Sequence, residues 1–175
     1  MKNIRQMGLE NWWGGLSMSD RSDRYLFRGK TFDVSAEWRE GSLFYDGDDA
    51  VILNNLSTYS DGFMEAFGDS VCLDTISQCT GLKDKNGKLI FEGDIITSVS
   101  YPFQDERKFN YNALVAWDDE LATFGYELHC VNPDKRGISH GMYEELGSRG
   151  EMSNYEIIGN AHDNPELLEL MDHDT

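Results

Sequence analysis

The hydrophobic residues of this chain occur in short runs that have the length and the period of β-strands. The runs at 25–29, 35–47 and 49–55 are rich in aromatic and β-branched residues and are punctuated by Gly and Asp. Aromatic and β-branched residues favour a pleated backbone, whereas Gly and Asp favour the turns between strands. The first third of the chain therefore predicts several short strands.

Turn residues divide this region further. We expect one strand to end at Gly41 and a second to occupy 43–45, after which the acidic "DGDD" at 46–49 turns the chain into a third strand. The following segment, "YSDGFMEAFGDS" at 59–70, fits either one helical turn or a loop. The acidic turn thus predicts a hairpin, while the structure of 59–70 stays open.

The second half of the chain shows the strand period more clearly. Apolar and polar residues alternate on both sides of the acidic "DDE" at 118–120, which predicts two strands joined by a turn. "YEIIGN" at 155–160 predicts a last strand. A helix is expected in "DNPELLELM", because Asn164 can cap it and Pro165 suits the first helical position.

Together these elements indicate a mainly β fold of two small antiparallel β-sheets or barrels with a short C-terminal helix. The rhythm of residues 93–160 is that of a small SH3-like barrel. We expect a flexible N-terminal arm at 1–20 and an N-terminal β subdomain at 21–80. A C-terminal β-barrel-like subdomain, with the terminal helix, is expected at 81–175.

Acidic residues dominate the charge of the chain. There are 32 Asp and Glu against 15 Lys and Arg, which gives a net charge of -17. Affinity for nucleic acid comes largely from basic groups that release counterions from phosphates, so this balance argues against a nucleic-acid partner. Solubility and self-repulsion are the simple explanation of the excess. The alternative is an acidic DNA mimic that inhibits a host DNA-binding protein, which requires the carboxylates to gather on one face.

Several features favour a cytoplasmic protein without a membrane partner. No apolar run approaches the roughly 20 residues that cross a bilayer, and the N-terminus lacks the apolar core of a signal peptide. The three cysteines are odd in number and form no C-x-x-C pair. Such cysteine usage favours reduced thiols over a disulfide framework.

The most patterned stretch is "TGLKDKNGKLIFEGDII" at 80–96. Its glycines and lysine suggest a phosphate-binding loop, but five residues separate Gly81 from Gly87, and Leu89 replaces the hydroxyl residue. By contrast, Asn86 with Gly87 is a strong signal for a hairpin with a type I′ turn, in which both residues take a positive φ. We therefore interpret the stretch as a hairpin, with lysines that keep its exposed tip soluble.

The same stretch resembles the signature of the YopX family of phage and prophage proteins, which runs approximately Y-T-G-L-K-D-K-N-G-K-x-I-[FY]-E-G-D-I-[IV]. "YLFRGK" with "EWREGSL" is similar to the N-terminal part of that family, and "YEIIGNAHDNPELL" is similar to its C-terminal ending. Cys79 stands where an aromatic residue is usual, and Ala161 where Ile is usual. The resemblance implies a mainly β fold, a bacterial or phage intracellular setting and self-association, and it implies no established reaction.

The residues of this signature are expected to serve the fold, through turns and packing. Glu92, Gly93 and Asp94 are expected to form a second turn. The whole set is Thr80, Gly81, Leu82, Lys83, Asp84, Asn86, Gly87, Gly93, Asp94, Ile158, Gly159, Asn160, Asn164 and Pro165.

The sequence contains no recognisable catalytic set, cofactor site or metal site. Its histidines and cysteines lack the spacing of a zinc site, and no motif of a catalytic nucleophile occurs. The two acidic clusters fall in predicted turns, where Asp is favoured for its bonds to the backbone. The alternative is a metal-dependent phosphodiesterase or nuclease, in which Asp46, Asp48, Asp118 and Asp119 converge on a metal.

The leading hypothesis is a non-enzymatic phage or prophage accessory protein. It would be a self-associating β module, and thus a homo-oligomer, that acts by binding a host or phage protein. Exposed strand edges and the pair Trp12 and Trp13 in the predicted arm are the candidate interface. Unpaired edges and Trp side chains are both frequent at protein contacts.

Overall fold

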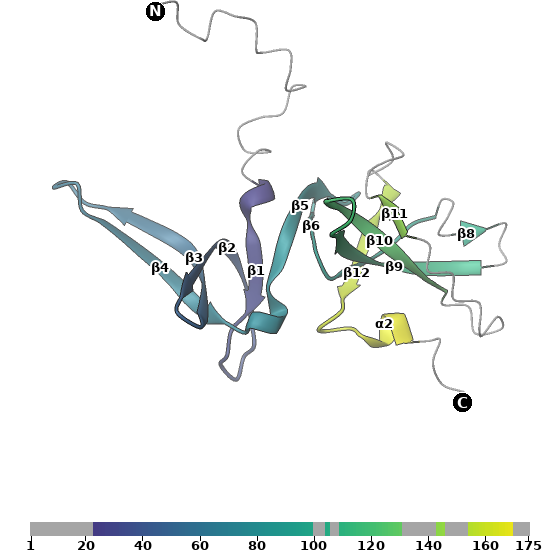
Figure 1. Ribbon diagram of the computed structural model, residues 1–175, viewed down its shortest axis with the longest axis horizontal. Coiled ribbons are helices and arrows are strands. Elements are labelled where there is room, and N and C mark those ends of the chain that lie inside the picture. The colour runs from purple at the N-terminus through teal and green to yellow at the C-terminus, as the bar shows by residue number, and fades with distance from the viewer. Residues whose placement is uncertain (1–22, 100–103, 106–108, 131–142, 146–153, 170–175) are drawn as a thin grey trace, which may run out of the picture.

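The computed structural model describes residues 23–99, 104–105, 109–130, 143–145 and 154–169. Within these ranges the chain forms two antiparallel β-sheets that follow one another along the long axis of the molecule (Figure 1). Strands β1 to β6 make the first sheet and β7 to β12 make the second. The predicted mainly β fold with two antiparallel sheets is confirmed.

The first sheet has the strand order β4-β3-β2-β1-β5-β6. Strand β1 pairs with β2 on one side and with β5 on the other, so the chain returns to the middle of the sheet after β4. The 3₁₀ helices η3 (Asp23–Tyr25) and η4 (Leu73–Thr75) precede β1 and β5. The strands are β1 (Phe27–Lys30), β2 (Trp38–Asp46), β3 (Asp49–Thr58), β4 (Met64–Val71), β5 (Ser77–Lys83) and β6 (Leu89–Phe91).

Strand β2 is continuous where the sequence predicts two strands. It passes through Gly41 without a turn, so the expected end of a strand at this residue is wrong. A Cβ atom at Gly41 would lie 2.1 Å from the carbonyl oxygen of Leu53 on β3, so the glycine allows the two strands to approach closely. The acidic turn after β2 is confirmed: Asp46 pairs with Asp49, and Gly47 between them has a φ of +63°.

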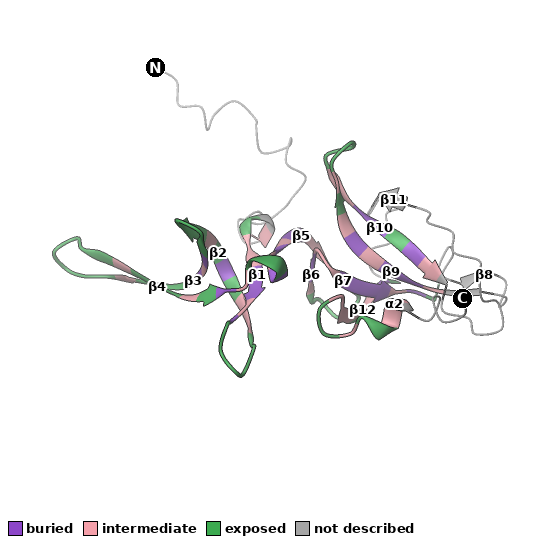
Figure 2. Ribbon diagram, turned by 60° about the horizontal axis from the view of Figure 1, so that its bottom comes forward, coloured by how far each residue is buried: buried purple, intermediate pink, exposed green. Residues whose placement is uncertain are grey.

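The segment left open by the sequence is neither a helical turn nor a loop. It forms a turn and then strand β4, which pairs with β3 along its whole length. The backbone N–H of Tyr59 donates to the carbonyl oxygen of Phe63 at 2.8 Å and closes the turn. The resulting β3–β4 hairpin projects from the rest of the sheet, and Figure 2 shows that its outer half is exposed.

The second sheet follows the order β11-β10-β9-β7-β12, with β8 paired to β9. The two strands predicted around "DDE" are β9 and β10, and the predicted last strand is β12. The larger hydrophobic core lies mainly on this sheet and includes Ile90 from β6 of the first sheet. Its buried residues are Ile90, Ile96, Ala113, Val115, Tyr126, Leu128 and Tyr155. The strands are β7 (Asp94–Thr97), β8 (Gln104–Asp105), β9 (Phe109–Asp118), β10 (Thr123–Cys130), β11 (Tyr143–Glu145) and β12 (Glu156–Asn160).

The sequence predicts either sheets or barrels, and the structure has sheets. Within the described residues, β11 and β12 at the two ends of the second sheet do not pair, so no closed barrel forms. Strand β5 runs across residue 80, and the division into subdomains at that residue stays a prediction. The predicted N-terminal arm, with Trp12 and Trp13, lies outside the described residues.

The expected C-terminal helix is present as α2 (Glu166–Glu169). It lies beside β9, where Asn112 Nδ2 donates to the carbonyl oxygen of Leu167 at 3.0 Å. Among the helices that the structure describes, none has the length and apolar character needed to cross a membrane.

Candidate functional site

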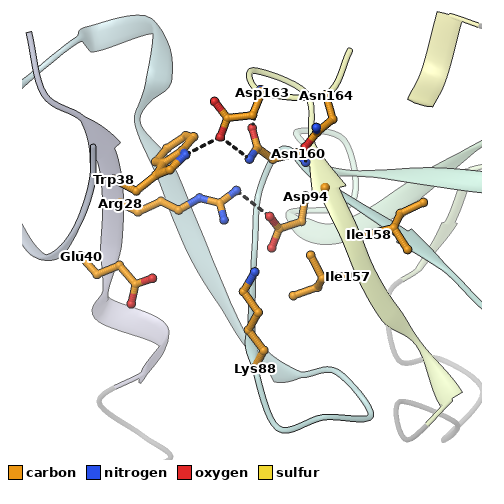
Figure 3. Close-up of a pocket in the computed structure, with 11 residues that line it drawn as sticks. Arg28, Trp38, Glu40, Lys88, Asp94, Ile157, Ile158, Asn160, Asp163 and Asn164 are labelled. Carbon is orange, nitrogen blue, oxygen red and sulfur yellow. Dashed lines mark hydrogen bonds and ion pairs between the residues drawn. The ribbon is translucent and has the colours of Figure 1, made fainter. Parts of the chain in front are cut away.

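A pocket of about 360 Å³ lies where the two sheets meet (Figure 3). Strands β1 and β2 contribute Arg28, Trp38 and Glu40, while Lys88 precedes β6 and Asp94 begins β7. The pocket is therefore built from segments at the beginning, the middle and the end of the chain. Its remaining wall comes from β12 and the loop after it: Ile157, Ile158, Gly159, Asn160, Asp163 and Asn164.

The floor of the pocket is a buried ion pair between the two sheets. Arg28 Nη2 lies 2.7 Å from Asp94 Oδ1, and the two side chains are only 7% and 1% exposed. Arg28 Nη2 also donates to the carbonyl oxygen of Glu92 at 3.3 Å, and the backbone N–H of Phe91 donates to Asp94 Oδ2 at 2.8 Å. The guanidinium lies between two rings, with Cζ 4.7 Å from the centroid of Trp38 and 4.8 Å from that of Phe91.

The electrostatics of this ion pair follow from its burial. Burial raises the pKa of Asp94, and the positive charge of Arg28 and the N–H of Phe91 oppose that shift without cancelling it. Removing two charges from water costs free energy, which their mutual attraction offsets only while both are present. The pair therefore fixes the place at which the first sheet meets the second.

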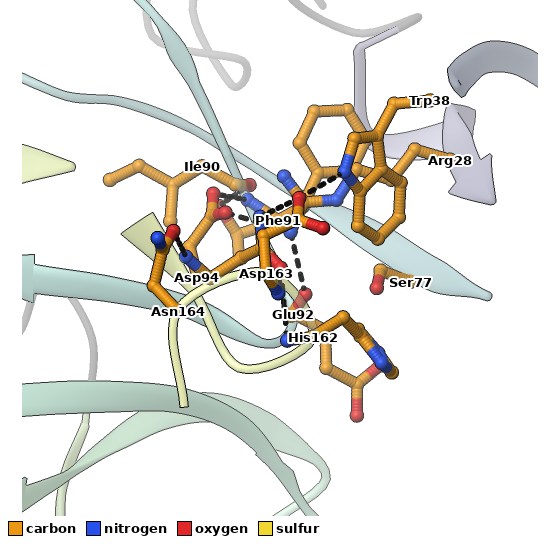
Figure 4. Close-up of polar contacts among 12 residues, drawn as sticks. Arg28, Trp38, Ser77, Ile90, Phe91, Glu92, Asp94, His162, Asp163 and Asn164 are labelled. Atoms are coloured by element: carbon orange, nitrogen blue, oxygen red, sulfur yellow. Dashed lines mark hydrogen bonds and ion pairs between the residues drawn. The ribbon is translucent and has the colours of Figure 1, made fainter. Parts of the chain in front are cut away.

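Asp163 forms a second polar cluster at the rim of the pocket (Figures 3 and 4). Its carboxylate accepts hydrogen bonds from Trp38 Nε1 at 2.6 Å and from Asn160 Nδ2 at 2.9 Å, and it pairs with Lys30. Burial raises the pKa of Asp163, but these donors outweigh it and hold the pKa well below its ordinary value. Asn160 Oδ1 accepts the backbone N–H groups of His162 and Asp163, which fixes the loop that carries the carboxylate.

The depressed pKa of Asp163 predicts a pH dependence of stability. Its folded pKa lies below the value of about 4 in an unfolded chain, so its contribution is complete above about pH 4 and is lost as the pH falls further. We expect Asp163→Asn to unfold at a lower temperature than the wild type at about pH 6, and the difference to shrink toward pH 2. Thermal unfolding at a series of pH values measures it.

The control for this experiment is Asp74→Asn, which changes an exposed carboxylate that forms no side-chain hydrogen bond with a described residue. Its difference from the wild type should stay small and constant across the same pH range. A difference for Asp163→Asn that is also independent of pH would contradict the assignment.

The loop between β12 and α2 is packed so closely that it requires a glycine. A Cβ atom at Gly159 would lie 2.6 Å from Asn164 Oδ1 and 2.8 Å from Leu167 Cδ1. Asn164 Oδ1 accepts the backbone N–H of Asn160 at 3.4 Å, so this side chain turns back toward β12. The expected cap of α2 by the Asn164 side chain is therefore wrong, because the side chain closes the loop instead.

Asp84 organises the tip of the β5–β6 hairpin. The hairpin is confirmed, but only Gly87 of the two expected turn residues has a positive φ, at +81°, so the predicted type I′ turn is wrong. The backbone N–H of Asp84 donates to the carbonyl oxygen of Lys88 at 2.8 Å and closes a longer turn. The physical reason is the Asp84 side chain, whose Oδ1 accepts the backbone N–H groups of Asn86 and Lys88 at 2.8 and 2.9 Å.

The hairpin tip also joins the two sheets. The backbone N–H of Ile157 on β12 donates to Asp84 Oδ2 at 3.3 Å, and the backbone N–H of Lys85 donates to the carbonyl oxygen of Tyr155 at 2.8 Å. Lys85 Nζ lies 2.6 Å from Glu156 Oε2. Burial raises the pKa of Asp84, but the N–H donors outweigh it and hold the pKa below its ordinary value. The buried Asp84 carboxylate is thus a link between β12 and the first sheet.

The family model described as "YopX protein" matches residues 27–169, a range that includes every residue of the pocket. The chain belongs to the YopX family. No curated protein matches it. Protein EF1440 from Enterococcus faecalis, for which a crystal structure is known, is similar to this YopX chain with 25% sequence identity and a TM-score of 0.51. The match covers 82% of this chain and 96% of that protein, so the two share their fold over most of their lengths.

The YopX signature is concentrated at the contact between the two sheets. Five of its residues line the pocket: Asp94, Ile158, Gly159, Asn160 and Asn164. The assignment of the signature to turns and packing stays a prediction. Its other members lie in or directly after β5 (Thr80, Gly81, Leu82, Lys83, Asp84, Asn86 and Gly87), directly before β7 (Gly93) or directly before α2 (Pro165).

The aspartates of the nuclease alternative lie in two separate turns. Asp46 and Asp48 lie at the turn between β2 and β3, and Asp118 and Asp119 lie where β9 turns into β10 in the other sheet. Asp118 Oδ1 accepts the backbone N–H of Glu120 at 2.8 Å, as expected for a turn aspartate. In the part of the chain that the structure describes, no three His, Cys, Asp or Glu side chains form a group that could hold a metal ion.

The set of signature residues missed six residues that line the pocket: Arg28, Trp38, Glu40, Lys88, Ile157 and Asp163. A weak signal for them exists, since all six lie inside the stretches that resemble the YopX family. Arg28 lies in the four-residue strand β1 beside a second charged residue, Lys30, so its burial is not evident from the sequence. The sequence around Arg28 does not identify Asp94 as its partner, because Asp94 lies in the other sheet.

Proposed function

We propose that this YopX protein is a non-enzymatic phage or prophage accessory protein, which acts by binding other proteins and self-associates through its β3–β4 hairpin. The observation that carries the proposal is the set of large apolar side chains that the hairpin leaves in solvent. Leu56, Phe63 and Met64 are each 60–62% exposed. Tyr59 and Phe67 are exposed on the opposite face of the same hairpin, where the Tyr59 hydroxyl donates to Glu65. Clustered exposed apolar side chains mark interaction sites in soluble proteins.

A second copy of the chain fits this hairpin surface (Leu56, Tyr59, Phe63, Met64 and Phe67) best. Strand β4 ends the first sheet, and only Val71 on its outer edge forms a bridge to another described residue. A two-fold axis beside β4 would pair this edge with its own copy and cover both hairpin surfaces. Residues 50–60 contain no charged side chain in a chain of net charge -17. Strand β4 carries two acidic residues, of which Asp69 pairs with Arg39 and Glu65 accepts a hydrogen bond from Tyr59, so two copies meet there at limited electrostatic cost.

The double substitution Leu56→Lys and Met64→Lys tests this surface. Both side chains are exposed, and the register places Leu56 opposite Ala66 and Met64 opposite Thr58, on the same face of the hairpin. Light scattering after size-exclusion chromatography should give a multiple of 19.9 kDa for the wild type. The variant should give 19.9 kDa, because two added charges on each copy repel across the contact.

The matched control is Leu121→Lys, which adds a lysine at a side chain that is 66% exposed in the β9–β10 turn. This variant should keep the mass of the wild type at low and at high salt. A wild type that elutes as a monomer at about 100 μM, far above a micromolar Kd, would rule out self-association. A double variant that remains oligomeric would move the contact away from the hairpin.

A further inference from the structure

The pocket between the sheets holds two charged side chains without a partner. Lys88 and Glu40 both line it, and neither side chain forms a hydrogen bond or an ion pair with any residue that the structure describes. Figure 3 shows that they enter the pocket from different walls, Glu40 from β2 and Lys88 from the β5–β6 hairpin. The pocket therefore presents one positive and one negative side chain that make no direct polar contact with a described residue, while Arg28 lies opposite Glu40 in the β1–β2 register and the charge of Lys88 acts on Asp94.

The other charged groups of the pocket are already engaged. Arg28 pairs with Asp94, and Asp163 pairs with Lys30 and with the indole of Trp38. A ligand in the pocket can therefore pair with the ammonium group of Lys88 and with the carboxylate of Glu40, and it does not meet an excess of charge of one sign.

Further groups are available to a ligand. Asn164 lines the pocket with its amide, whose oxygen accepts a backbone N–H, while its Nδ2 makes no hydrogen bond with a described residue. The side chains of Trp38 and Ile157 form the apolar part of the pocket wall. A volume of about 360 Å³ lies within the range of pockets that hold small molecules.

We propose that this pocket binds a small zwitterionic molecule of the size of an amino acid. Its carboxylate lies on Lys88, with the Asn164 amide as a further donor, and its ammonium group lies on Glu40. The aliphatic body between the two charges lies on Trp38 and Ile157.

A singly charged ligand fits less well. A simple anion pairs with Lys88 but faces Glu40 in a chain of net charge -17, and a simple cation pairs with Glu40 but faces Lys88. Since Lys88 and Glu40 form no ion pair with each other, a ligand with a spacer between its charges can span the gap that they leave. This site does not depend on the hairpin surface.

Isothermal titration with a series of amino acids of increasing spacer length tests the proposal. The probes are glycine, β-alanine, 4-aminobutyrate and 6-aminohexanoate, with acetate and ethylammonium as singly charged controls. At least one member of the series should give saturable binding, and both controls should bind at least about tenfold more weakly, because each lacks one charge-assisted contact. Absence of saturation for the whole series at about 10 mM overturns the proposal. Equal binding of acetate overturns it as well.

Two substitutions locate the site. Lys88→Met and Glu40→Gln each change an exposed side chain that has no partner among the described residues, so the fold should persist. Each should weaken the best probe at least about tenfold. The control is Lys83→Met, on the same hairpin but paired with Asp23 at 3.4 Å and outside the pocket, and it should bind as the wild type does. Unchanged binding by Lys88→Met overturns the assignment.

Discussion

Replacing Asp94 with alanine should lower the free energy of unfolding by about 3–5 kcal/mol, because it leaves Arg28 as a buried charge without its partner. The Arg28 side chain is 7% exposed and lies between the rings of Trp38 and Phe91, so its charge has little contact with water to offset the lost carboxylate. The backbone N–H of Phe91 loses its acceptor in the same substitution. Urea unfolding measures the effect as a shift of the midpoint.

Two variants separate the burial of this ion pair from ion pairing in general. Glu37→Ala breaks the exposed pair with Arg39 and should cost less than about 1 kcal/mol. The double variant Arg28→Met with Asp94→Leu should recover much of the loss, because it removes both charges from the interior. A loss below about 1 kcal/mol for Asp94→Ala would show that the pair does not hold the sheets together.

Replacing Asp84 with alanine should lower the free energy of unfolding by about 2–4 kcal/mol, since three backbone N–H groups lose their acceptor in a partly buried place. These donors belong to Asn86, Lys88 and Ile157, so the turn and its contact with β12 are weakened together. Urea unfolding gives the free energy. Hydrogen exchange at Ile157 should accelerate in parallel, because this amide is the one on the other sheet.

The matched control for Asp84 is Asp74→Ala, at an exposed carboxylate in η4. It should change the free energy of unfolding by no more than about 0.5 kcal/mol. If Asp84→Ala were equally mild, the hairpin tip would hold its shape through its backbone alone. Faster exchange at Ile157 without a loss of global stability would instead show that Asp84 stabilises only its local contact with β12.

Elements whose pattern reflects local burial could be predicted from the sequence. Strands β9 and β10 alternate because one face of each packs into the core, and the β5–β6 hairpin was predicted from its Asn86–Gly87 turn. Strand β4 could not be predicted, since most of its residues on both faces are exposed or half-buried and no period of two arises. The turn type at Gly87 depends on the Asp84 side chain, which no turn rule for the two central residues includes.

The pocket could be predicted only in part. Asp94 and Asn160 lie in stretches that match the YopX family. The period of a strand predicts which face of the sheet a side chain occupies, but it does not predict which other strand that side chain contacts. Arg28 and Trp38 lie in the first sheet, whereas their partners Asp94 and Asp163 lie at the second. Gly41 shows the same limit, because its role depends on a carbonyl of the neighbouring strand and not on its own neighbours in the chain.

The contacts of β12 have a consequence for synthesis of the chain. The carbonyl of Tyr155 and the amides of Ile157 and Ala161 bind Lys85, Asp84 and Gly93, which are translated long before them. The Arg28–Asp94 pair between the sheets needs no residue of β12, but these further contacts of the hairpin tip with the second sheet form only once β12 has emerged. A ribosome that stops before residue 155 releases a chain whose hairpin tip lacks its contacts with β12, so incomplete copies should be more open to proteolysis than finished ones.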